Sequence, residues 1–106
     1  MPKYLVMATY VGEGVEGLME EGGSARREAV VKLLDSVGGK LESIYYAFGD
    51  IDVYAVVELP DNVTAAAVAL TINASGEVSV TTTPLLTPEE IDQAVKKSPD
   101  YRAPGD

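Results

Sequence analysis

The chain has 106 residues, room for one domain with a modest core, and 17 acidic against 8 basic side chains give it a formal charge of −9. This balance argues against a nucleic-acid partner, because phosphate binding needs a basic face. Neither cysteine nor histidine occurs, which removes disulfides, thiolate chemistry, imidazole metal ligands and the usual neutral-pH general base. No apolar run approaches about 18 residues and no signal segment is recognisable, so we expect a cytoplasmic protein with no membrane partner.

The first half of the chain alternates strand and helix signals. The apolar and aromatic run Tyr4–Tyr10 predicts a strand, and Val15–Glu21 is suited to a short helical turn. Ser24 is then the expected N-cap of a helix whose apolar residues follow helical spacing as far as Val37. The double glycine Gly38-Gly39 ends that helix.

A hairpin follows. The pattern predicts two strands, Leu41–Phe48 and Val53–Leu59, with a tight turn between them at Gly49–Asp52. In the second strand, Val53, Ala55, Val57 and Leu59 alternate with the other residues and are expected to face the helices.

Helix and strand signals also alternate in the second half of the chain. Val63–Ala74 predicts a helix so rich in alanine that it lacks a polar face, and we expect it to be buried on more than one side. Glu77–Thr83 is the fourth strand. The run Thr87-Pro88-Glu89-Glu90 then starts a short helix that extends to about Lys97.

The order βαββαβ plus a C-terminal helix predicts an α+β fold, the ferredoxin-like plait with a four-stranded antiparallel sheet. Residues 1–97 form one domain and residues 98–106 a C-terminal tail. Right-handed crossovers place both main helices on one face of the sheet. The other face is too apolar to be well solvated, which indicates a partner. The expected partner is a second copy, sheet against sheet, in a dimeric α+β barrel; higher assembly is possible.

Four segments carry a family likeness: EGGSARREAV (Glu21–Val30), GGKL (Gly38–Leu41), AFGDIDV (Ala47–Val53) and TTTPLLTPEE (Thr81–Glu90). Together they resemble the GYD domain family of small bacterial and archaeal ferredoxin-like proteins with no assigned activity. The family's naming motif has a tyrosine where this chain has Ile51. The resemblance, over roughly residues 1–103, implies the fold and oligomerisation, and it implies no reaction.

The first candidate site gathers at one end of the plait, where Tyr10, the start of the first long helix and the hairpin turn meet. Arg26 continues the apolar stripe of its helix and so needs a partner, for which Asp50 and Asp52 are the nearest carboxylates. One interpretation is an arginine–aspartate pair that ties helix to hairpin. The other is that Arg26 or Arg27, with helix-terminal N–H groups, holds a small anion such as a carboxylate or phosphate.

The second candidate set is Tyr45, Tyr54 and Thr81. These side chains either fill a sheet–sheet interface or line a cavity that orients a hydrophobic or aromatic ligand. Two carboxylates at Asp50 and Asp52 make at best a weak calcium or magnesium site, so neither a metal nor a cofactor is predicted.

Three classes of function fit these patterns. The leading one is a homo-oligomeric binding module that holds a small organic or anionic ligand between subunits. The second is a cofactor-independent oxygenase, isomerase or decarboxylase, whose acid or base would be Asp52, Asp50, Glu58 or a tyrosine. The third is a purely structural subunit that contacts another chain through its alanine-rich or C-terminal helix.

Overall fold

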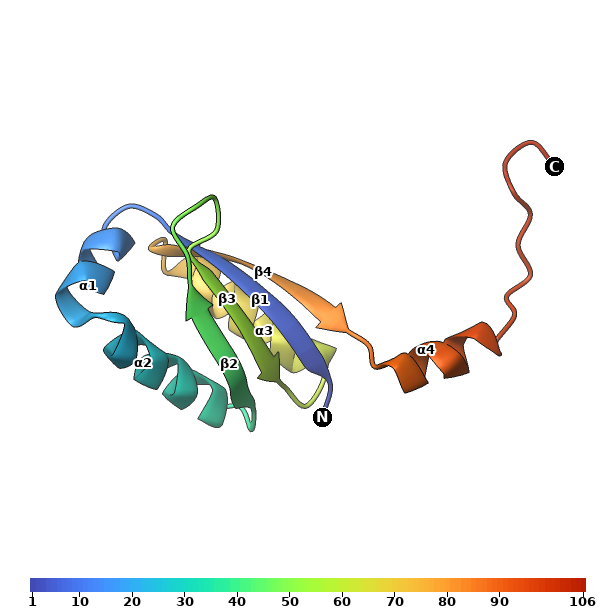
Figure 1. Ribbon diagram of the computed structural model, residues 1–106, viewed down its shortest axis with the longest axis horizontal. Helices are drawn as coiled ribbons and strands as arrows, with labels where there is room; N and C mark the ends of the chain where they lie inside the picture. The colour runs from blue at the N-terminus through green and yellow to red at the C-terminus, as the bar shows by residue number, and fades with distance from the viewer.

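The strands form a single four-stranded sheet in the order β2-β3-β1-β4, with each neighbouring pair antiparallel. The computed structural model describes all 106 residues. Its elements are β1 (Lys3–Tyr10), α1 (Gly14–Glu21), α2 (Gly23–Asp35), β2 (Lys40–Tyr46), β3 (Val53–Glu58), α3 (Asn62–Ala74), β4 (Val78–Leu85) and α4 (Pro88–Val95). The chain is therefore α+β, and its strand order is consistent with the expected plait. Figure 1 shows α4 and the C-terminal tail projecting away from the sheet.

The core lies between the sheet and the two helices α2 and α3. The predicted alternation of β3 is confirmed, because its four helix-facing residues are all buried. Leu34 of α2 and Ala65 of α3 join the same core cluster, so both helices cover one face. Tyr4 is buried there as well, and its hydroxyl donates to Asn62 Oδ1 at 2.6 Å. This bond satisfies the phenol and joins β1 to the start of α3.

The start of α2 differs from the prediction. Its N-cap is Gly22 and not Ser24, because α1 is a full eight-residue helix that continues to Glu21. Gly22 has a φ of 81°, in the left-handed region that favours glycine. The chain therefore changes direction at Gly22, and α2 begins before Ser24 is reached. By contrast, the predicted start of α4 is confirmed, with a complete capping box between Thr87 and Glu90.

The alanine-rich helix α3 covers the sheet with one side only. Ala65 is its only buried residue, and the large apolar side chains of Val63 and Leu70 are exposed. The expectation of burial on more than one side is therefore wrong for the single chain. The prediction failed because α2, the second helix that could have covered α3, lies at the other edge of the sheet.

That second helix, α2, packs against β2, whereas α3 packs against β4. These two strands are the opposite edges of the sheet. The backbones of the two helices approach each other less closely than they approach these edge strands, and a space is left between them over the middle of the sheet. None of the four helices has the length and apolar character that crossing a bilayer requires.

Two glycines of α1 provide a matched test of how this helix packs against the start of β4. A Cβ on Gly14 would collide with the carbonyl oxygen of Glu77, whereas a Cβ on Gly17 meets no heavy atom within 4 Å. We expect Gly14→Ala to lower the free energy of unfolding by about 1–3 kcal/mol. Gly17→Ala should raise it by about 0.5–1 kcal/mol, because alanine favours helix. Urea unfolding measures both values, and equal effects would contradict the contact between α1 and the start of β4.

Candidate functional site

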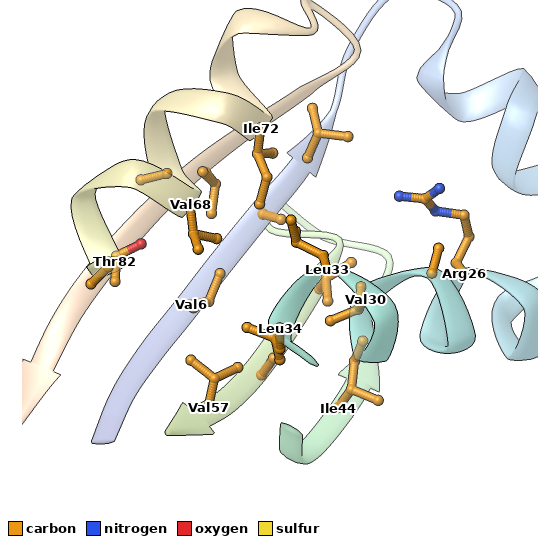
Figure 2. Close-up of a pocket in the computed structure, with 18 of the residues that line it drawn as sticks. Val6, Arg26, Val30, Leu33, Leu34, Ile44, Val57, Val68, Ile72 and Thr82 are labelled. Carbon is orange, nitrogen blue, oxygen red and sulfur yellow. The ribbon is translucent and has the colours of Figure 1, made fainter. Parts of the chain in front are cut away.

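An apolar cavity of about 120 Å³ occupies the space between α2, α3 and the sheet (Figure 2). Small side chains explain why the space is not filled. Five of the residues that line it are alanines: Ala8, Ala29, Ala55, Ala65 and Ala69. An apolar cavity of roughly 150 Å³ stays free of water and accepts benzene. The cavity is therefore close to the size of one small hydrophobic group.

Arg26 is the only charged residue that lines this cavity. It belongs to the first turn of α2, and Figure 2 shows its guanidinium at one end of the lining side chains. The Nε atom is buried and has no hydrogen-bond partner. The nearest carboxylate oxygen, Glu21 Oε2, lies 3.7 Å from Nη1, beyond hydrogen-bond distance. Arg26 therefore keeps unused N–H donors beside an apolar cavity.

The expected pair between Arg26 and the hairpin aspartates is not formed. Asp52 instead bonds to β1: its Oδ2 accepts the N–H of Tyr10, and its own N–H donates to Ala8 O, both at 2.9 Å. Pairing of β1 with β3 ends at Ala8 and Val53, so the last backbone groups of β1 need partners from the turn. The hairpin is thus tied to a strand, and the carboxylate that Arg26 pairs with is that of Glu21.

The remaining two charged candidates take no part in this cavity. Asp50 is exposed. Its backbone carbonyl oxygen, and not its carboxylate, accepts the Thr9 hydroxyl at 3.3 Å. Arg27 is exposed on the outer side of α2 and does not line the cavity. No group of three or more His, Cys, Asp or Glu side chains is placed to hold a metal ion.

Tyr46 is the residue at this end of the fold that sequence reasoning missed. Its hydroxyl donates to Gly23 O at 3.0 Å, which ties β2 to the start of α2. With Tyr10 and Asp52 it also lines a second, more open hollow of about 350 Å³ beside α1. Burial raises the pKa of Tyr46, and the neighbouring Tyr10 raises it further, whereas the positive charges of Arg26 and Arg27 oppose the shift. The signal was present in the strand alternation, since Tyr46 shares a side with Ile44.

Tyr45, Tyr54 and Thr81 lie together on the opposite face of the sheet. Tyr45 stands directly across from Tyr54, and Met7 stands across from both Tyr54 and Thr81. The four side chains form one row over all four strands, which we call the aromatic row. Tyr45 is 72% exposed. The predicted residues thus form two separate sets, with the cavity on one face and the aromatic row on the other.

The raised pKa of Tyr46 has a consequence for stability at high pH. The fold favours the protonated phenol, so this contribution is complete below the pKa of an unfolded tyrosine, about 10, and is lost as pH rises through the higher folded pKa. We expect Tyr46 to contribute a late component to a tyrosinate absorbance titration of the chain. Tyr46→Phe should remove that late component and weaken the fall of unfolding free energy above about pH 10.

Tyr45→Phe is the matched control, because it removes a phenol from the neighbouring position on the other face. It should leave the late component in place. Loss of that component in the Tyr45 variant and its retention in the Tyr46 variant would contradict the assignment.

Comparison with known proteins places the chain in a family. The sequence pattern of the GYD domain matches residues 4–95, from the second residue of β1 to the end of α4. No curated protein and no solved structure matches the chain. Because the matched segment spans most of the 106 residues, this protein belongs to the GYD domain family.

Proposed function

We propose that this protein is a homo-oligomeric binding module that holds a small apolar carboxylic acid between α2 and α3, with the carboxylate on Arg26. One observation carries the proposal: the only charged residue lining an apolar cavity presents a buried Nε without a partner. A buried donor left unpaired costs free energy, and a bound carboxylate removes that cost.

The size and lining of the cavity define the apolar part of the ligand. About 120 Å³ accommodates a phenyl ring or a short branched alkyl chain, and burial of that group is favourable because it leaves water. Benzoate and isovalerate fit this description. Longer chains would extend past the cavity into solvent.

The charge of the site favours a carboxylate over a phosphate. A single guanidinium matches the two oxygens of a carboxylate in planar geometry. A phosphate would bring a charge of about −1.5 to −2 against that one cation, with Glu21 as a neighbouring acid. This excess negative charge would be poorly solvated beside apolar side chains.

The proposed ligand site lies within a single chain, whereas the sequence led us to expect a ligand between subunits. The exposed aromatic row remains a surface for self-association, and we propose that two copies pair through it as a dimeric α+β barrel in the cytoplasm. Its large and partly exposed apolar side chains support this assignment, since a face of this kind is typical of an interface.

Binding is favoured over acid–base catalysis because of where the candidate acids lie. None of Asp50, Asp52 and Glu58 lines the cavity. A cofactor-independent reaction on a ligand held there would have to use Tyr10, the one phenol in the lining. No observation favours that reaction over binding.

Adjacent arginines on α2 allow a controlled test of the proposed site. We expect Arg26→Gln to weaken benzoate binding by about 10- to 100-fold, the range that loss of a charged hydrogen bond produces. Arg27→Gln makes the same change in net charge outside the cavity and should leave the affinity near that of the wild type. Isothermal titration calorimetry measures both. Benzyl alcohol, which lacks the carboxylate, should bind equally to the two variants.

An equal loss in the two variants would indicate a general charge effect and contradict the assignment to Arg26. Absence of benzoate and isovalerate binding by the wild-type chain would overturn the proposed ligand class.

Two alanines of α3, one in the cavity lining and one exposed, test whether the cavity itself is the site. Ala69 lines the cavity, whereas Ala66 is exposed and does not. Ala69→Leu should fill the space, reduce benzoate affinity by about 10-fold or more, and raise the free energy of unfolding by about 1–2 kcal/mol through added burial. Ala66→Leu should change neither property to that extent. Unchanged benzoate affinity in a folded Ala69→Leu variant would show that the ligand binds elsewhere.

A further inference from the structure

The helix α4 is formed by strong local signals. Thr87 Oγ1 accepts the Glu90 N–H at 3.1 Å, and Glu90 Oε1 accepts the Thr87 N–H at 2.9 Å. Pro88 stands at its start, where the missing N–H costs nothing. The helix has only eight residues, however, and isolated helices below about 12–15 residues are marginal in water. It therefore needs a surface to pack against.

One side of α4 is suited to such a surface. Ile91, Ala94 and Val95 follow the i, i+3, i+4 spacing of an apolar stripe. Leu86 and Ile91 occupy the two positions of a hydrophobic staple. Ile91 is nonetheless 47% exposed and Val95 71% exposed. Gln93 lies on the opposite side of the helix, so the stripe is distinct from the polar face.

The chain's own domain does not cover this stripe. α4 forms no extensive contact with another helix or strand, and every residue from 83 to 102 is exposed. Figure 1 shows the helix and the tail leading away from the body. The radius of gyration is 16.9 Å, compared with roughly 13 Å for a compact domain of this length.

The exposed area is correspondingly large. The chain exposes 7422 Å², whereas a folded monomer of 11.2 kDa exposes roughly 5,700 Å². The excess of about 1,700 Å² is twice the roughly 800 Å² that one partner contributes to a standard interface. An arm that becomes buried in a dimer accounts for this excess.

We propose that residues 86–106, the C-terminal arm, pack on a second copy of this chain, with the apolar stripe of α4 beside that copy's open sheet face. The open sheet face supports a second copy as the partner, because the same chain offers an apolar surface there, with Tyr45 72% and Tyr54 41% exposed. Residues 1–85 carry 12 acidic and 5 basic side chains and the arm carries 5 acidic and 3 basic ones, so the proposed contact is one between apolar surfaces and not between opposite charges.

The position of the arm agrees with a reciprocal exchange. It follows β4 directly, with α4 starting two residues later, and β4 contributes Thr81 to the aromatic row. An arm that leaves the edge of that face reaches a copy stacked on it, and two-fold symmetry then repeats the contact. The arm thus extends the sheet–sheet pairing proposed above and rests on that part of the proposed function, but not on the ligand.

Ile91 and Gln93 provide the test on the full-length chain. Ile91→Asp places a charge in the stripe, and Gln93→Asp places the same charge on the opposite side of the helix. We expect the wild-type chain to sediment as a dimer at micromolar concentration. Ile91→Asp should raise the dimer dissociation constant by about 10-fold or more, because a buried carboxylate has no partner there. Gln93→Asp should stay near the wild-type value.

A second measurement separates contact between copies from folding back within one chain. In a mixture of isotope-labelled and unlabelled chains, the Ile91 and Val95 methyls should show nuclear Overhauser contacts to residues of the other copy. Contacts confined to one chain, an unchanged Ile91→Asp dimer, or equal weakening by both variants would each overturn the arm proposal and leave the sheet pairing standing. A monomeric wild-type chain would overturn both. Benzoate affinity reports the ligand site independently, and Ile91→Asp should leave it unchanged.

Discussion

The structure depends on how two helices cover one face of a four-stranded sheet. α2 packs at one edge of the sheet and α3 at the other, and five alanines are among the side chains that line the space between them. Side chains of that size cannot reach across the gap, so the lining atoms lose contacts that a close-packed core would supply. The cavity follows from this shortage of volume, and a bound apolar group would restore the missing contacts.

Strand alternation then assigns different roles to the two faces. Tyr45 and Tyr46 are neighbours in sequence, yet one joins the aromatic row and the other bonds to the start of α2. The bond from Tyr10 N–H to Asp52 fixes the hairpin on β1. Together these contacts hold the end of the cavity near Arg26 without using the arginine itself.

Sequence reasoning predicted the features that local chemistry controls. The buried residues of β3 followed from a two-residue period, and the capping box of α4 followed from Thr87 and Glu90 alone. It failed where the partner of a side chain lies in an element that is remote in sequence. Arg26 needed a carboxylate and two aspartates lay in the nearby turn, but the free backbone groups at the end of β1 took Asp52. The Ser24 cap failed similarly, because α1 extended to Glu21.

The sequence by itself determined the elements, their order, the face to which most strand residues point and the family, because periodicity, capping and turn chemistry act over a few residues. Only the tertiary structure decided that α2 and α3 stand apart, that Arg26 keeps an unpaired donor beside a cavity, and that α4 leaves the body. These properties depend on distances between elements remote in sequence, and no local pattern specifies such distances.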